Sequence, residues 1–280
     1  MSIAKLASIE LIKTRKRFGV WMALLFFFGF FAISLTGGYL EHLRTGLAGT
    51  PLPQSWPGLI DLAGNLGLLV LLVMVVLLTA SEKTWRTQRQ NVIDGLSRTQ
   101  FFAAKLVTMM ALVFILWIGV LLLTGTFGAL ERMGETAELP IARDVDMKLM
   151  GGLLLSLTLV GAMGLFFGTV SSSSGAGLAL AFLFLFSQGP IGMLLVREGG
   201  VWASTAAFLP MQVLQALTNT MTFDPEAYAR FAETMRQMEE RGQSFPMPRP
   251  LVASEAIVAA VIYATALLGG AWLVIRRRDL

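Results

Sequence analysis

The side chains that carry out most enzymatic chemistry are scarce in this sequence. It contains one histidine, His42, and no cysteine. A metalloprotease needs two or three histidine-type ligands around its metal, and a serine or cysteine hydrolase needs a base beside its nucleophile. Neither arrangement can be assembled here, and the sequence has no G-x-x-x-x-G-K-[ST] phosphate-binding loop. We therefore expect a chain without catalytic residues, without a metal and without a cofactor of its own.

The most informative spacing lies in the segment 81–105. Basic and apolar residues recur there at helical spacing: Trp85, Arg89, Val92, Ile93 and Leu96. They predict a short amphipathic helix, which Gly95 can end. Ser97 and Gln100 form a capping-box pattern that opens the next helix. A short helix joined rigidly to two longer ones is suited to receiving a push from another protein. A helix that merely rests on lipid headgroups would show the same pattern.

The elements that must position this segment are long and apolar. Hydrophobic residues make up 55% of the chain and charged residues 14%, where a soluble domain carries about 25% charged residues. The apolar residues gather in blocks of about 20, the length of a helix that crosses a bilayer. The sequence therefore predicts an all-α integral membrane protein with six transmembrane helices, over residues 18–36, 62–80, 106–128, 149–170, 178–196 and 251–275.

The distribution of charge predicts the orientation of these helices. With the N-terminus in the cytoplasm, the inner segments hold 13 basic residues against 4 acidic ones, and the outer segments hold 9 against 14. Positively charged loops stay in the cytoplasm. We therefore expect a multi-pass protein of the cell membrane with both termini cytoplasmic. The basic balance then reflects contact with the lipid bilayer, and no nucleic acid is expected as a partner.

Two further segments are expected to lie outside the six spans. Near the N-terminus, a rough apolar stripe precedes a basic cluster and predicts an amphipathic helix in the inner interface. The outer segment 197–250 is expected to contain a polar helix that begins at Asp224. Within it, residues 201–221 are apolar but interrupted by Pro210 and several polar residues. We expect this stretch to lie on the membrane surface or to re-enter from the outer side.

Several short motifs together resemble those of ABC-2 type permeases, the membrane subunits of ATP-binding-cassette exporters. They are Glu10 before the first span, Glu82 after the second, Phe101, Phe102 and Lys105, the run Asp94-Gly95-Leu96-Ser97-Arg98 and the ending Arg276-Arg277-Arg278-Asp279-Leu280. The chain departs from the family in two respects. Its outer region between the last two spans, about 197–250, is longer than in many members. Family members often have proline before the Leu-Ser-Arg triplet, where this chain has Asp94-Gly95.

The resemblance implies partners as well as a fold. Two copies of a cassette ATPase, which would bind ATP and Mg, are expected to dock below a pair of permease subunits, identical or related. The contact with the ATPase would fall on a coupling helix that includes Trp85, Arg86, Arg89, Val92, Ile93 and Asp94. In the fifth span, Gln188 and Pro190 are candidates for the translocation path, as is Trp117 in the third. A neutral, aromatic-rich interior suits an amphiphilic, lipid-like or peptide substrate.

Two other classes of protein fit parts of the same pattern. A membrane scaffold that moves nothing would have the same spans and would not need an ATPase. An ion-coupled secondary transporter normally keeps ionisable residues at membrane depth, and the centres of these spans carry none. Gly161, Gly164 and Gly168 allow close helix packing, which we expect within one subunit rather than between two.

Overall fold

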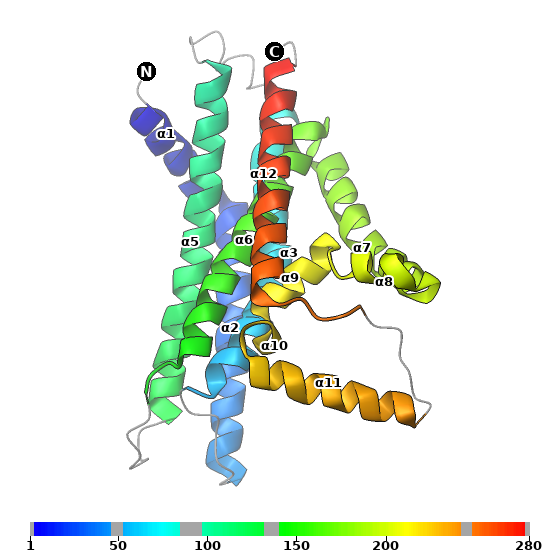
Figure 1. The fold of residues 1–280 in the computed structure, drawn as a ribbon. Helices are drawn as coiled ribbons and strands as arrows, with labels where there is room; N and C mark the ends of the chain where they lie inside the picture. Colours follow the sequence, from blue (N-terminus) through cyan, green and yellow to red (C-terminus); the bar gives the residue numbers. More distant parts are fainter. Residues whose placement is uncertain (1–2, 46–52, 85–96, 132–139, 242–247, 278–280) are drawn as a thin grey trace.

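The structure is a computed structural model that describes residues 3–45, 53–84, 97–131, 140–241 and 248–277. All regular elements in these ranges are α-helices (Figure 1). Six of them are long and apolar enough to cross a membrane: α2 (Phe18–Thr45), α3 (Ser55–Thr84), α5 (Arg98–Glu131), α6 (Asp144–Val170), α7 (Ser174–Glu198) and α12 (Ala253–Arg277). The shorter helices are α1 (Ile3–Arg15), α8 (Gly200–Ala206), α9 (Pro210–Thr218), α10 (Thr220–Phe223) and α11 (Pro225–Glu240).

The six long helices match the predicted spans in number, and most of them extend beyond the predicted bounds. An apolar block marks only the middle of a helix, whereas backbone hydrogen bonding continues until a cap ends it. At the start of α5 the predicted capping box is present. The Ser97 N–H donates to Gln100 Oε1 over 3.1 Å, and the Gln100 N–H donates to Ser97 Oγ over 3.2 Å. His42, which follows the first predicted span, lies in the last turns of α2.

Helix α6 lies at the centre of the bundle. It packs against α3, α12, α5, α7 and α9, and a larger share of its apolar stretch is buried than in any other long helix of the described residues. The three glycines of its stripe explain the close approach. A Cβ at Gly161, Gly164 or Gly168 would come within 3.0 Å of Met109, Val75 and Thr79 respectively. These neighbours lie on α5 and α3, so the glycines serve packing within the subunit, as predicted.

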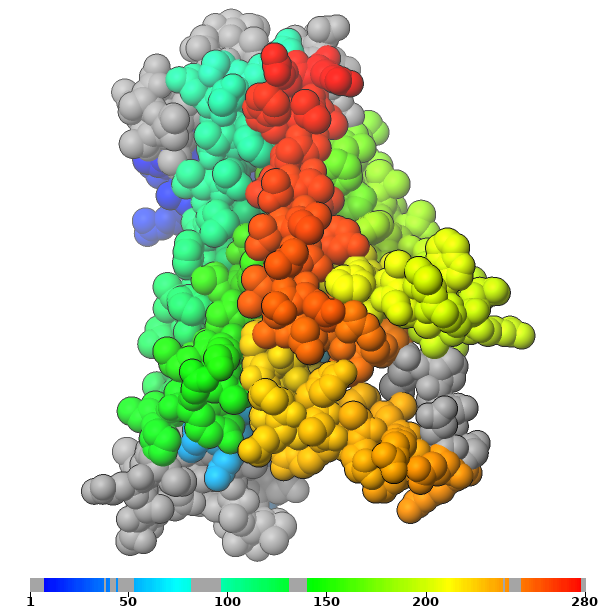
Figure 2. Space-filling view, in the orientation of Figure 1, coloured from blue at the N-terminus to red at the C-terminus, as the bar shows by residue number. Residues whose placement is uncertain are grey.

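The stretch 201–221 forms short helices and is not a seventh span. The chain leaves α7 through Gly199 and Gly200, whose φ angles of 74° and 55° strongly favour glycine. Helix α8 then projects sideways from the bundle (Figures 1 and 2). Helix α9 turns back and buries Val213, Leu214 and Leu217 against α3, α6 and α12. The stretch therefore divides into α8, which projects from the bundle, and α9, which packs against it.

Helix α11 extends laterally at the end of the bundle opposite the chain termini (Figures 1 and 2). Its predicted start is confirmed, because Asp224 Oδ1 accepts a hydrogen bond of 3.0 Å from the Glu226 N–H. The chain returns to α12 through Arg249, which forms a two-point ion pair with Glu255 over 2.8 and 2.9 Å. This ion pair raises the pKa of Arg249 and fixes the entry into α12.

Candidate functional site

Helix α1 joins the bundle at the end where both termini lie (Figure 1). It ends at Arg15, and a sharp elbow leads into α2. The Trp21 indole N–H donates to the Arg15 carbonyl over 2.7 Å, and the Arg17 N–H donates to the Thr14 carbonyl over 3.1 Å. These bonds use carbonyls at the end of α1 that have no partner within the helix. The elbow therefore places α1 across α5, with which it makes most of its contacts.

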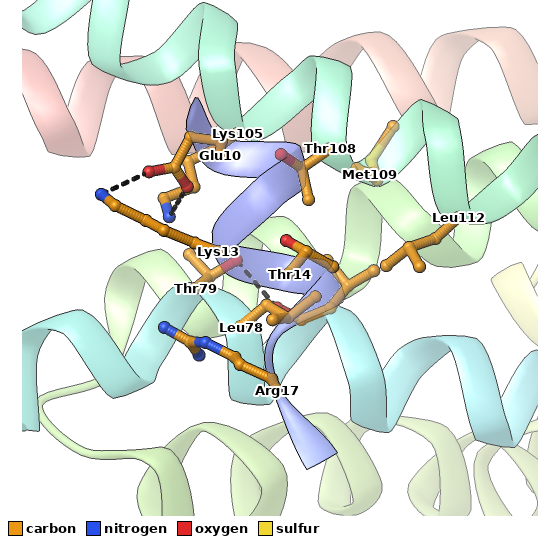
Figure 3. Close-up of a pocket in the computed structure, with 11 residues that line it drawn as sticks. Glu10, Lys13, Thr14, Arg17, Leu78, Thr79, Lys105, Thr108, Met109 and Leu112 are labelled. Atoms are coloured by element: carbon orange, nitrogen blue, oxygen red, sulfur yellow. Dashed lines mark hydrogen bonds and ion pairs between the residues drawn. The ribbon is translucent and has the colours of Figure 1, made fainter. Parts of the chain in front are cut away.

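A buried carboxylate holds α1 in place, as Figure 3 shows. Glu10 Oε2 lies 2.6 Å from Lys105 Nζ on α5, and Glu10 Oε1 lies 2.9 Å from Lys13 Nζ on α1. The carboxylate thus contacts one ammonium group through each oxygen. We call Glu10, Lys13 and Lys105 the Glu10 cluster. Glu10 and Lys105 are 95 positions apart along the chain, so their contact exists only because α1 docks on α5.

Two members of the Glu10 cluster are buried. Glu10 is 6% exposed and Lys105 is 5% exposed. The walls combine hydroxyl and apolar side chains from three helices with the Arg17 side chain after the elbow. The hydroxyl and apolar residues include Thr14, Leu78, Thr79, Thr108, Met109 and Leu112. Lys105 Nζ also lies 5.5 Å from the centre of the Phe101 ring, within the range of a cation–π interaction. Buried charges in such a setting must remain paired, because an unpaired one loses its hydration without compensation.

The protonation state of Glu10 follows from two opposing effects. Burial raises the pKa of its carboxyl group, whereas Lys105 and Lys13 lower it by charge and by hydrogen bonding. The combined effect of the two lysines is larger than that of burial, so the pKa of Glu10 lies below its ordinary value of 4.5. Glu10 is therefore ionised at neutral pH.

The depressed pKa predicts how stability depends on pH. A group whose pKa is lower in the folded state contributes stability above its unfolded pKa and loses it as the pH falls through its folded pKa. The difference in thermal midpoint between wild type and Glu10→Gln should stay constant above about pH 4.5 and shrink below it. Differential scanning fluorimetry in detergent across this range measures the effect. A difference that grows toward low pH would contradict the assigned sign.

Two further contacts tie the neighbouring helix ends together. Arg17, after the elbow, donates to Ser81 Oγ near the end of α3 over 2.5 Å. Arg98, at the start of α5, donates to the carbonyl of Arg276 at the end of α12. We call the region of Arg17, Ser81, Arg98, Lys105 and Arg276 the N/C end of the bundle. There, α1, α3, α5 and α12 are linked by polar contacts, with the Glu10 cluster between α1 and α5.

The predicted site residues do not come together in the described part of the chain. The six coupling residues, Trp85, Arg86, Arg89, Val92, Ile93 and Asp94, lie outside the described residues. The Trp117 indole N–H donates to the Met150 carbonyl over 2.8 Å, between α5 and α6. Gln188 is buried, and its Oε1 accepts the Met211 N–H over 2.6 Å, between α7 and α9. Pro190 is exposed on α7. Their role in a translocation path stays a prediction.

The sequence did not indicate the Glu10 cluster as a site. Spacing suggested that an apolar stripe of α1, with Ile9 and Ile12, would face the membrane. In the structure the side of α1 toward the bundle buries Glu10 and Thr14, and Ile12 is 53% exposed. The sequence signal that could have indicated the cluster is Glu10, the acidic residue of the N-terminal helix, together with Lys105 at the edge of an apolar block. Such a pair can be recognised only when both helices are known to pack.

No family model matches this chain, and no curated protein matches it significantly. Within the described residues, no group of three His, Asp or Glu side chains converges as a metal site would require. The geometry therefore defines the chain by its class: a multi-pass, all-α protein with six helices able to span a membrane. Among the described residues, a buried ionic link joins the N-terminal helix to α5.

Proposed function

We propose that this chain is the permease subunit of an ATP-driven exporter of the ABC-2 type. Two copies, or one copy and a related chain, would form the translocation route, and two separate ATPase subunits would supply the energy from ATP and Mg. The chain itself would catalyse no reaction. The substrate would be an amphiphile, a lipid-like molecule or a peptide, in keeping with a neutral and aromatic-rich bundle.

The linkage at the N/C end is the observation that carries this proposal. The predicted coupling residues occupy positions 85–94, between the end of α3 at Thr84 and the start of α5 at Arg98. Both flanking helices are anchored there: α3 to Arg17 through Ser81, and α5 to Glu10 through Lys105. A force applied to the coupling residues would therefore reach α1, α3 and α5 together. A rigid link of this kind suits an energy-coupling subunit.

The proposed orientation places the N/C end in the cytoplasm. Basic residues concentrate there, including Lys13, Arg15, Lys16, Arg276 and Arg277, and basic segments are retained on the cytoplasmic side. Cassette ATPases work where ATP is present, so the coupling residues must face the same side. The lateral helix α11 would then lie on the outer side.

Purification from the native membrane in mild detergent tests this function. We expect a cassette ATPase to accompany the tagged chain in stoichiometric amount, and the preparation to hydrolyse ATP. Val92→Asp together with Ile93→Asp should remove the ATPase and the hydrolysis while the helical content stays unchanged. The matched control is Ala229→Asp together with Ala232→Asp on the exposed face of α11, which should retain both. A crosslinked native membrane that yields no ATPase would point instead to a membrane scaffold.

A further inference from the structure

A second feature of the α1–α2 elbow is an apolar groove on the side of α1 that faces away from the Glu10 cluster. It encloses about 350 Å³ between α1, α2 and α5. Its residues include Leu11, Arg15, Trp21, Leu24, Ala111 and Ile115. Thr14, Thr108 and Leu112 line both this groove and the Glu10 pocket, so the two lie back to back.

The groove opens onto apolar surface that faces outward from the bundle. Trp21 is 55% exposed and Ile115 is 46% exposed, although both line the groove. The surface continues along α2 through the exposed side chains of Phe18, Met22 and Leu25. In a helix that crosses a membrane, this surface meets lipid tails. The groove is therefore accessible from the hydrocarbon region rather than from water alone.

The rim of the groove is basic. Arg15 lines it and is the only charged residue to do so in the described part of the chain, and the exposed Lys16 follows directly at the elbow. Glu10, the acidic residue of α1 nearest to Arg15 along the chain, forms ion pairs with Lys105 and Lys13 on the other side of the helix. The Trp21 indole N–H donates a hydrogen bond to the Arg15 carbonyl. This bond holds the aromatic ring at the mouth of the groove. An occupant therefore meets apolar walls and a cationic rim.

We infer that this groove binds one anionic phospholipid, with an acyl chain between α2 and α5 and the phosphate at Arg15. The apolar walls fit the chain, and the cationic rim fits the headgroup, since basic residues at a membrane surface attract anionic lipids. A zwitterionic lipid gains less from the rim. Because the groove shares a wall with the Glu10 pocket, the bound lipid packs against α1 and helps to hold it on α5.

Native mass spectrometry of the purified full chain tests this inference with two synthetic lipids, dioleoylphosphatidylglycerol and dioleoylphosphatidylcholine. We expect one phosphatidylglycerol to stay bound at collision energies that remove detergent, and to raise the thermal midpoint more than phosphatidylcholine does. Arg15→Gln should weaken phosphatidylglycerol binding about fivefold, the effect of one basic residue at a membrane surface. It should leave phosphatidylcholine binding unchanged.

A second variant tests the apolar part of the site. Ala111→Trp fills the groove and should abolish retention of phosphatidylglycerol. Ala179→Trp is its matched control, because Ala179 is exposed on α7 and lines none of this groove. Equal retention by both tryptophan variants would overturn the inference, as would equal retention of the two lipids by wild type. Competition by glycerophosphoglycerol, which has the headgroup but no chains, would assign the site to a soluble phosphate and also overturn it.

The lipid site and the ATPase partner can fail separately. The inference on lipid binding requires only that the bundle lies in a membrane, and its readouts do not involve ATP. Loss of phosphatidylglycerol from wild type with the ATPase still attached would overturn the lipid site alone. Retention of the lipid by a chain without any ATPase would overturn the proposed function alone.

Discussion

Replacing Lys105 with methionine should destabilise the N/C end by about 3 kcal/mol, the lower part of the range for breaking a buried ion pair. Methionine keeps the length of the side chain and removes its charge. Glu10 would remain 6% exposed with Lys13 as its only partner in the cluster. We expect a lower thermal midpoint in detergent and faster hydrogen–deuterium exchange in α1, because α1 would no longer be held on α5.

Two variants distinguish the charge effect from a packing effect. Glu10→Gln combined with Lys105→Met removes both charges and should recover most of the lost stability, since neither partner is then left buried and ionised. Lys148→Met is the control for an exposed pair, because Lys148 lies 2.5 Å from Asp144 with both side chains at least half exposed. It should change stability by no more than about 0.5 kcal/mol. If Lys105→Met left α1 as protected as in wild type, the cluster would not be what holds α1.

Replacing Gly152 with alanine should cost about 3 kcal/mol, the upper part of the range for overpacking a close contact. A Cβ at Gly152 would overlap the carbonyl oxygen of Leu217 in α9 and would lie 3.1 Å from the Phe223 ring. Backbone cannot rotate away as a side chain can, so α9 would have to shift as a unit. We expect a lower thermal midpoint and faster hydrogen–deuterium exchange in α9.

The adjacent residue provides a close control. Gly151 lies in the same helix, and no atom lies within 4 Å of the position that its Cβ would take. Gly151→Ala should therefore be neutral, or stabilising by up to about 1 kcal/mol from the higher helix propensity of alanine. Equal midpoints for the two alanine variants would show that α9 does not pack on α6 at this point.

The helices themselves could be predicted from the sequence because their signals are local. An apolar block of about 20 residues must form a helix if it lies in a bilayer, since the backbone has no other partner there. The caps at Ser97 and Asp224 are equally local, because each involves residues within one helical turn. The stripe of Gly161, Gly164 and Gly168 also indicated close packing, although it did not name the neighbouring helices.

The candidate site could be predicted only in part. Glu10 and Lys105 each belonged to a motif that resembles ABC-2 permeases, but nothing in the sequence paired them. Their contact requires the elbow at Arg15–Phe18, whose direction depends on the Trp21 and Arg17 hydrogen bonds. Likewise, the polarity of Gln188 was visible, whereas its bond to the Met211 N–H depends on the return of α9 to the bundle.

The sequence by itself determined that this chain forms six long apolar helices and a further helix before the first of them. It also determined that the segment 197–250, before the last long helix, is not one continuous helix. These features follow from hydropathy and capping, which act over one or two helical turns. Only the tertiary structure decided that α1 crosses α5, that α9 re-enters the bundle, and that Glu10 meets Lys105. The physical reason is that many helix arrangements bury the same apolar area, and a few specific contacts between distant residues select one of them.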